Sequence, residues 1–251
     1  MRLFVSIVIA LFVSGIFFFM IKFWGLSQPH IDYNHNFYKD VTTPLIFKTL
    51  TERNFTELLH SSEPLYIHLA ITADDKVVLA FPESQLSYRK IKFADLKNQG
   101  ILLEKEIEFL NNKKIIFNVI ENPAAGPDIL FAEFQKLKLD KAENFIITSP
   151  YEAVLKELKT KSPTWIFGTS TPEILKIKAM ESLFLIESAS YRADMVIYPL
   201  KYYHQDFYSE KMLTDLKRRF KRFIVGPIPE KDLSEAKKLN PFGIILEAGV
   251  P

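Results

Sequence analysis

A run of uncharged residues near the amino terminus, LFVSIVIALFVSGIFFFM at positions 3–20, most constrains what this chain can fold into. Nothing in the run is more polar than serine. A helix of about 20 apolar residues spans a hydrocarbon core roughly 30 Å thick, and Ile21 and Phe23 extend the run to that length. Trp24 suits the membrane interface. We therefore predict that residues 1–24 form a transmembrane signal-anchor that holds the protein in a membrane through residues 3–24.

Two other interpretations of this run stay open. A cleaved secretory signal usually has an apolar stretch of about 7 to 15 residues that ends in small residues. Here the run is longer and Ile-Lys-Phe-Trp follows it, with no Ala-x-Ala pattern. The other alternative is a buried core helix.

The charges that flank the run indicate its orientation in the membrane. Arg2 favours a cytoplasmic amino terminus, whereas Lys22 weakly opposes it. We expect a single-pass inner-membrane protein whose remaining chain is periplasmic or extracellular.

The charge balance argues against a nucleic-acid partner. Arg2 and Lys22 are two of the 32 basic residues, and the chain after residue 25 holds equal numbers of basic and acidic residues. A neutral domain has no net field to attract nucleic acid. The basic cluster at 217–222 is typical of a helix carboxyl terminus, where cations complement the macrodipole. The chain has no cysteine, so it needs no disulfide and offers no thiolate metal site.

Short apolar runs and amphipathic stretches alternate after the anchor. Residues 25–42 lack periodicity and predict a linker, and residues 43–251 predict one domain. The expected strands are brief, β-branched or aromatic, and lie at 45–48, 65–70, 115–119, 145–148, 164–167, 195–198, 223–225 and 244–246, with an extra one at 77–81. The expected helices lie at 54–59, 104–110, 127–137, 150–158, from 171 onward, 209–219 and 229–239.

Strands that alternate with helices pair in parallel, because each crossover needs a helix. An open doubly wound sheet and a closed (β/α)₈ barrel both meet this condition, and eight strands favour the TIM barrel. The eighth expected strand is followed by few residues. We therefore expect either that the linker covers the missing helix position or that the barrel is imperfectly closed.

Few residues point to chemistry. The sequence has no Gly-rich phosphate loop, zinc signature or Gly-x-Ser-x-Gly elbow. Reacting groups of a TIM barrel lie at the carboxyl ends of its strands. Among the five histidines, His68 sits where a strand could direct it into a barrel, although an isolated histidine is more often structural. Glu121 and Glu247 also fall at strand ends, where the simpler interpretation is a solvated loop acid.

Four stretches resemble glycerophosphodiester phosphodiesterases in pattern and order. They are LYIHLAITADDKVVLAFPESQL (65–86), KIIFNVIENP (114–123), NFIITSPYEAVLKELKTKSP (144–163) and RFKRFIVGPIPEKDLSEAKKLNPFGIILEAGVP (219–251). The first matches the family's strand, Thr-x-Asp-Gly turn and returning strand, and the second resembles its Leu-Asn-Ile-Glu-Ile-Lys strand. The resemblance implies a (β/α)₈ barrel, a divalent cation such as Ca²⁺ or Mg²⁺, and cleavage of glycerophosphodiesters to glycerol 3-phosphate and an alcohol.

The catalytic motifs of that family are replaced in this chain. Where the family has His-Arg-Gly after strand one, this sequence has Phe47-Lys48-Thr49-Leu50. The Glu-x-Asp pair of the second strand falls on Tyr66 and His68. The returning strand's His-Asp falls on Phe81-Pro82, with Glu83 next, and the third-strand Glu and Lys fall on Ile120 and Asn122. Glu121 is one residue out of register, and such a shift turns a side chain to the opposite face.

These losses lead to one principal hypothesis. We expect a membrane-anchored, phosphodiesterase-like barrel that is catalytically degenerate and acts in binding or as a scaffold at the cell envelope, with a lipid-derived or glycerophosphate-like ligand. Ca²⁺ or Mg²⁺ would be needed only if hydrolysis is retained. One alternative is an active hydrolase with a rearranged site, and another is a periplasmic solute-binding or interaction module. The weak catalytic candidates are His68 and Glu121, and the pocket-lining candidates are Lys48, Tyr66, Phe81, Glu83, Asn122 and Glu247.

Overall fold

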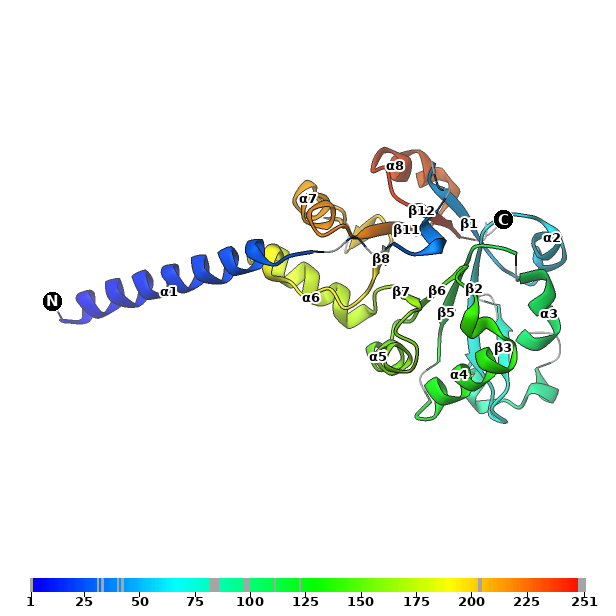
Figure 1. Cartoon of the computed structure of the whole chain (residues 1–251). Helices are drawn as coiled ribbons and strands as arrows, with labels where there is room; N and C mark the ends of the chain where they lie inside the picture. Colours follow the sequence, from blue (N-terminus) through cyan, green and yellow to red (C-terminus); the bar gives the residue numbers. More distant parts are fainter. Residues whose placement is uncertain are drawn as a thin grey trace.

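The computed structural model describes residues 2–30, 32, 34–39, 41, 43–81, 86–96, 100–110, 112–121, 123–202 and 205–247. It has two parts, a long amino-terminal helix and an α/β domain at one end of it (Figure 1). Helix α1 runs from Arg2 to Ser27 and is exposed along most of its length. By length and composition the stretch Phe4–Ser27 is able to cross a membrane. The helix therefore continues three residues past the predicted anchor boundary at residue 24.

Eight parallel strands form the wall of a nearly closed barrel, which confirms the predicted fold class. Their order is β7-β6-β5-β2-β1-β12-β11-β8, so β1 lies between β2 and β12, as closure requires. An open doubly wound sheet is therefore excluded. The strands are β1 (Leu45–Thr49), β2 (Leu65–Ile71), β5 (Ile115–Val119), β6 (Phe145–Thr148), β7 (Ile166–Phe167), β8 (Met195–Tyr198), β11 (Arg222–Ile228) and β12 (Gly243–Leu246).

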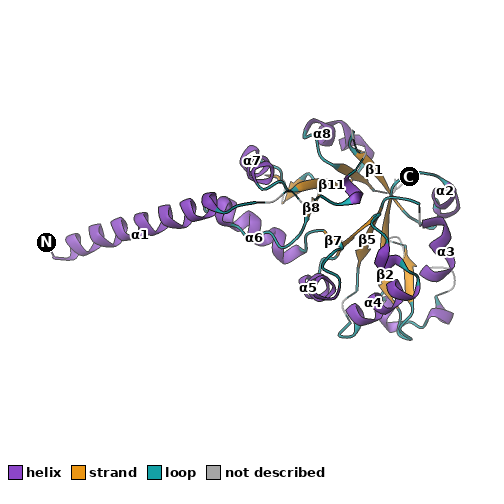
Figure 2. Ribbon diagram, in the orientation of Figure 1, coloured by secondary structure: helices purple, strands orange, loops and turns teal. Residues whose placement is uncertain are grey.

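Helices cover the outside of this wall (Figure 2). They are α2 (Phe55–His60), α3 (Leu103–Leu110), α4 (Gly126–Lys136), α5 (Glu152–Lys161), α6 (Thr171–Ser182), α7 (Glu210–Arg218) and α8 (Leu233–Lys238). The prediction that one helix begins at Pro150 was wrong, because α5 begins at Glu152. The reason is local: Ser149 Oγ donates to the carbonyl of Val119 and accepts the amide of Tyr151, which holds Pro150 in a turn.

An antiparallel excursion leaves the wall after β2. Strand β3 (Val77–Ala80) returns along β2, and β4 (Gly100–Leu102), which the sequence did not predict, pairs with β3. The turn between β2 and β3 is tight, with Thr72 Oγ1 2.8 Å from Asp74 Oδ1. Asp75 adopts a φ of 58° there, the left-handed conformation in which the resembling family has glycine. The predicted turn is thus present, with an aspartate in the glycine position. A smaller hairpin, β9 (Lys201–Tyr202) and β10 (Gln205–Asp206), lies outside the barrel sheet.

Side chains alternate between the barrel interior and the helix layer. The interior is packed with one or two side chains from each strand: Phe47, Tyr66, Ile116, Ile146, Ile166, Met195, Ile197, Ile224 and Ile245. Phe37 joins this cluster from the short helix η1 (Asn36–Tyr38), within the segment predicted as a linker. The centre of its ring lies 5.9 Å from that of Phe242, which precedes β12, and the two rings are tilted by 37°. Part of the predicted linker therefore closes the amino-terminal end of the barrel.

Strands β7 and β8 meet at an incomplete seam. β7 has two residues, and a single parallel bridge, Gly168 to Met195, joins the two edges. Side chains supply further bonds: Thr169 Oγ1 donates to the carbonyl of Ile197 and accepts its amide, both at 3.0 Å. Asp194 Oδ2 accepts the amide of Phe167 at 3.0 Å. The imperfect closure expected after the eighth strand is not found there, because β12 pairs with β1 from Leu45–Gly243 to Lys48–Leu246; the incomplete pairing lies instead between β7 and β8.

Candidate functional site

The carboxyl ends of β2, β5 and β6 bring three polar side chains into one row at the barrel mouth. The register pairs His68 with Asn118 and Asn118 with Thr148. His68 follows the interior residue Tyr66 by two positions, and Asn118 likewise follows Ile116. Because strand side chains alternate with a period of two, all three lie on the interior face. His68 and Asn118 are half-buried, and Thr148 is buried.

His68 is held as a neutral imidazole. Its Nδ1 lies 3.1 Å from Asn118 Nδ2, and its ring meets that of Tyr66 edge-on at 5.1 Å between centroids. Burial lowers the pKa of His68 to about 4, because the cationic form loses its hydration. Burial also raises the pKa of the Tyr66 phenol, again because it disfavours the charged form. At neutral pH, both inward-facing side chains are therefore uncharged.

Threonine hydroxyls line the rest of the mouth but serve the barrel wall. Thr49 Oγ1 donates to the carbonyl of Leu246 and so ties β1 to β12. Thr148 Oγ1 donates to the carbonyl of Thr169 at 3.2 Å. Each hydroxyl gives a backbone carbonyl a hydrogen-bond partner at a point where strand pairing ends. This leaves His68 and Asn118 as the polar side chains best placed to meet a ligand.

The acids proposed from the sequence do not join His68. Glu121 faces out of the barrel, where its Oε1 lies 3.4 Å from the amide of Arg89 in the excursion. Ile120, its neighbour, points inward and packs with Ala70 and Tyr88 in a small cluster under the excursion. Glu247 follows β12 and is exposed. The structure thus brings together His68 and Asn118, but not His68 and Glu121.

The remaining candidates divide into three cases. Lys48 faces outward from β1 and forms an ion pair with Glu63 at 2.7 Å. Phe81 is buried at the end of the returning strand, where its amide donates to the Tyr88 hydroxyl at 3.2 Å. Glu83 and Asn122 lie outside the described residues. Sequence reasoning missed Asn118, although counting in twos from the buried Ile116 would have found it.

The described mouth does not fit Ca²⁺ or Mg²⁺. These ions take oxygen ligands, usually with several carboxylates. The inward positions of β2 and β5 present a buried phenol, a neutral imidazole and an amide. Among the residues that the structure describes, no group of three or more His, Asp or Glu side chains could hold a metal ion. No reaction step through a cation is therefore derived for this site.

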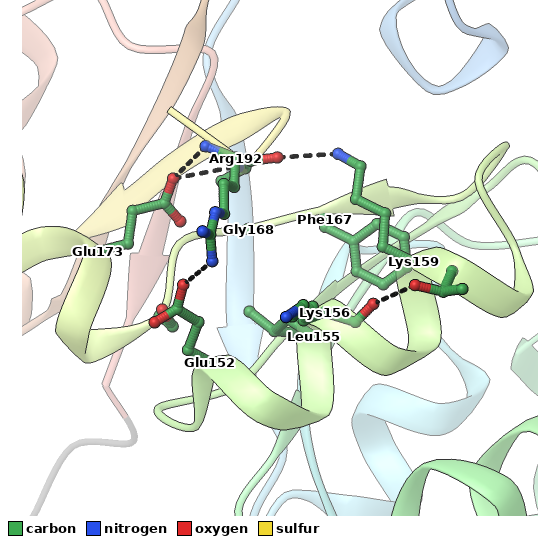
Figure 3. A pocket seen from close by; sticks show the side chains of 11 residues that line it. Glu152, Leu155, Lys156, Lys159, Phe167, Gly168, Glu173 and Arg192 are labelled. Carbon is green, nitrogen blue, oxygen red and sulfur yellow. Dashed lines mark hydrogen bonds and ion pairs between the residues drawn. The ribbon is translucent and has the colours of Figure 1, made fainter. Parts of the chain in front are cut away.

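A cavity of about 320 Å³ lies outside the barrel wall, between α5 and α6 beside the seam (Figure 3). Leu155 and Phe167 form its apolar part. The Glu173 carboxylate accepts the amides of Arg192 and Ala193 at 2.6 and 3.0 Å, and Arg192 also pairs with Glu152. These charges are thus already engaged in holding the loop before β8 against α5 and α6. We interpret this cavity as part of the seam rather than as the functional site.

Solved structures of known proteins identify the fold. Over 82% of this chain and 96% of the other, it matches a glycerophosphodiester phosphodiesterase from Agrobacterium tumefaciens, with a TM-score of 0.57 and 10% identity. A phosphodiesterase from Oleispira antarctica, solved with the product sn-glycerol-3-phosphate, matches over 82% and 93% with a TM-score of 0.56 and 15% identity. A protein from Galdieria sulphuraria, assigned to the glycerophosphodiester phosphodiesterases, matches over 83% and 95% with a TM-score of 0.61 and 14% identity.

The chain has the fold of these phosphodiesterases. No family model matches the sequence, and no curated protein is significantly similar to it. At sequence identities of 10 to 15%, these matches support a shared fold and do not determine the activity of this chain. The resemblance seen in the sequence is therefore confirmed at the level of the barrel fold.

Proposed function

We propose that this protein is a membrane-anchored barrel of the phosphodiesterase fold that binds a ligand or a partner without hydrolysing phosphodiesters. The observation that carries the proposal is the interior face of β2, which presents Tyr66 and His68 at the positions where the sequence resemblance implies an acidic pair. The neutral imidazole of His68 bonds to Asn118 rather than to a carboxylate. Among its described residues, such a mouth has hydrogen-bonding groups but no paired acid and base.

Physical chemistry supports a loss of turnover. A positioned general acid or base commonly contributes a factor of about 10² to 10⁴ to the rate, and several such groups are replaced at once. Glu121, one residue from the third-strand position, is turned away and bonds the Arg89 amide. The described residues also offer no ligand set for a divalent cation. Each of these changes alone would slow hydrolysis, and together they favour a binding or scaffold role.

The membrane anchor is the second part of the proposal. The exposed apolar face of α1 is unfavourable in water and favourable in lipid, and its length matches a hydrocarbon core. We propose that α1 stays attached as an anchor and that the domain lies on the periplasmic or extracellular side. Mass spectrometry of the mature protein tests attachment, and loss of the first helix would contradict it. Protease protection in spheroplasts tests the side.

The proposed ligand is a glycerophosphate-like or lipid-derived molecule. The Oleispira antarctica structure of the same fold holds sn-glycerol-3-phosphate. In this chain the half-buried His68 and Asn118 offer hydrogen-bonding groups inside the barrel mouth. We expect sn-glycerol 3-phosphate to bind weakly, and Asn118→Ala to weaken binding by roughly 5- to 10-fold, as the loss of one hydrogen bond implies. Asn112→Ala, an exposed asparagine before β5, serves as the control in titration calorimetry.

A hydrolysis assay tests the proposal directly. The full chain in detergent is incubated with a glycerophosphodiester and either Ca²⁺ or Mg²⁺, and release of glycerol 3-phosphate is measured against buffer. We expect no release above background. Turnover that is clearly above background and is abolished by His68→Ala or Glu121→Ala would overturn the proposal and establish a rearranged active site. Turnover that neither substitution changes would point to a contaminating enzyme, which repurification identifies.

A further inference from the structure

The face of the barrel opposite the mouth is where α1 joins the domain. α1 packs against η6 (Ile186–Ser188), the turn that follows α6, and Ser188 Oγ donates to the carbonyl of Ile21 at 2.7 Å. Arg218, at the end of α7, donates to the carbonyl of Gly25 at 3.2 Å. η6 and Arg218 precede β8 and β11, so α1 meets the amino ends of the strands. Figure 1 shows α1 running away from the carboxyl-terminal end of α6.

Large apolar side chains are exposed on this face. Phe184 is 67% exposed, Leu183 59% and Phe220 54%, and we call these three residues the basal patch. They follow the ends of α6 and α7, the two helices that also contact η6. The patch is therefore continuous with the end of α1, where Leu26 is 43% exposed. Leu26 lines one hollow together with Ile186 and Lys211, and the Lys211 ammonium lies 5.0 Å from the centre of the Phe184 ring.

The backbone of the basal patch gives a second, independent observation. Phe184 and Phe220 have φ angles of 60° and 54°, each at the residue where the helix turns back on itself. The return bonds run from Leu185 to Met180 and from Lys221 to Leu216, at 2.8 and 2.9 Å. This position is usually glycine or asparagine, because a left-handed conformation costs other residues roughly 1 to 2 kcal/mol. For Phe184 the exposed cation–π contact with Lys211 offsets only part of this cost, since such contacts contribute about 0.5 to 1 kcal/mol in water.

Two other helices end in the same left-handed conformation but carry a polar residue there instead of phenylalanine. α4 and α8 are followed by residues of the same conformation, Lys138 with a φ of 57° and Asn240 with a φ of 51°. Both are polar. The two phenylalanines thus belong to the two helices that contact η6 beside α1. A hydrophobic partner on that side of the domain explains why these two turns differ from the others.

The length of α1 identifies the partner. From Phe4 to Trp24 the helix rises about 30 Å, the thickness of a hydrocarbon core. Trp24 and Leu26 then lie at the interface, level with the basal patch. We propose that Leu183, Phe184 and Phe220 insert into the headgroup–acyl boundary of the bilayer that α1 spans. This inference rests on the anchor in the proposed function. Glu210 is exposed near Lys211 and Lys217 in the sequence and opposes their charge. The proposed insertion of the basal patch therefore depends on apolar contact rather than on net charge.

Depth measurements by spin labelling test this inference. The chain has no cysteine, so a single substitution places one nitroxide. The full chain, in vesicles of phosphatidylcholine and phosphatidylglycerol, carries the label at Phe184→Cys, Phe220→Cys or Leu183→Cys. Phe12→Cys on α1 reports insertion of the anchor. Phe109→Cys on α3, 41% exposed, is the matched control. Relaxation by oxygen, which concentrates in lipid, is compared with relaxation by a water-soluble nickel complex.

We expect oxygen to dominate at positions 12, 183, 184 and 220, and nickel to dominate at 109. Nickel dominance at the basal patch, with position 12 in lipid, overturns the inference and leaves the anchor intact. Nickel dominance at position 12 overturns the anchor itself. Labels on the patch that neither reagent reaches indicate contact with a second copy of the chain, which also overturns the inference. Position 183, the residue after α6 with a negative φ of −86°, serves if the phenylalanine variants fail to fold.

A double variant separates contact from folding. Phe184→Asn with Phe220→Asn places at both turns the residue that already occupies position 240. The domain is expected to fold with unchanged or higher thermal stability in detergent. In vesicles, a label at Leu183→Cys in this background is expected to shift toward the nickel-dominated value of position 109. An unchanged depth in the double variant would contradict a role of the two phenylalanines.

Discussion

At the scale of single residues, the site is defined by alternation along two strands. Tyr66 and His68 point into the barrel because they are two positions apart on β2, and Asn118 meets His68 because β5 pairs in register with β2. Glu121 is three residues after Asn118 and so takes the opposite side. One residue of register thus decides whether an acid reaches the mouth. The presence of an acidic residue near a motif is therefore weaker evidence for a catalytic site than the side of the strand on which its side chain lies.

The neutral state of His68 predicts a pH dependence of stability. Its pKa falls from the usual 6.5 to about 4 on folding, so between these values the unfolded chain binds a proton that the folded chain does not. The free energy of unfolding therefore decreases as pH falls through this window, by about 2 kcal/mol between about pH 7.5 and pH 5. His68→Gln should remove this component. Urea unfolding of both proteins in detergent at the two pH values measures it.

His60→Gln provides the control for that experiment, because His60 is exposed on α2. Its pH dependence should follow that of the wild-type chain. An equal fall in stability for His68→Gln and wild type would mean that His68 is protonated in the folded state.

At the scale of elements, the wall is weakest between β7 and β8. The two residues of β7 leave most of the edge of β8 without a ladder, and side chains of Thr169 and Asp194 take over the missing bonds. Lys159 in turn holds Asp194 at 2.8 Å. The seam is therefore a local hydrogen-bond network rather than a sheet, and its stability depends on individual side chains.

Removing one hydroxyl should open this seam. Thr169→Val keeps the shape of the side chain but leaves the buried amide and carbonyl of Ile197 without their partner. We expect a loss of about 1 to 3 kcal/mol in the free energy of unfolding. Thr160→Val removes an exposed hydroxyl that bonds within α5 and should change stability by less than about 0.5 kcal/mol. Similar losses in both variants, measured by chemical denaturation, would show that Thr169 does not carry the seam.

The junction between α1 and the domain depends on one glycine. A Cβ atom on Gly25 would lie 2.4 Å from the carbonyl oxygen of Glu187, whereas one on Gly15 would meet nothing within 4 Å. Gly25→Ala should therefore loosen η6, with amide hydrogen exchange at 186–189 faster by about tenfold. Gly15→Ala gains the same helix propensity without the clash. Equal exchange at η6 in the two variants would mean that α1 is not docked there.

At the scale of the whole molecule, anchor and mouth lie at opposite ends of the barrel. α1 contacts the turns before β8 and β11, while His68 and Asn118 lie toward the carboxyl ends of β2 and β5. Figure 1 shows α1 extending sideways from the ring of helices, so with α1 across a bilayer the mouth opens beside the anchor rather than toward the bilayer. A ligand then reaches the site from the aqueous side, so an intact lipid of the anchoring membrane is a poor candidate. A released headgroup or a soluble glycerophosphate fits this arrangement better.

Orientation of the mouth can be measured on the same vesicles. Glu247 is exposed after β12, at the carboxyl end of the wall. A nitroxide at Glu247→Cys should be relaxed by the water-soluble nickel complex and little by oxygen. A lipid-like depth at position 247, comparable with that at position 12, would mean that the mouth faces the membrane, and the argument for a soluble ligand would fail.

The sequence by itself determined the apolar helix, the order of the elements and the barrel class. Apolar periodicity reports which face of each element is buried, and this is a local property. It located β5, β6 and β8 to the residue. It missed β4, whose three residues are defined by pairing with β3 rather than by any pattern of their own.

The tertiary structure alone decided the site and the junction. Strand register placed Asn118 beside His68 and turned Glu121 away, because a side chain's neighbours across a sheet lie far apart in the sequence. Packing likewise brought η6 and Arg218 to the end of α1 and left the basal patch exposed around it. Periodicity predicts which faces are buried, but only the folded chain shows which exposed groups share one surface.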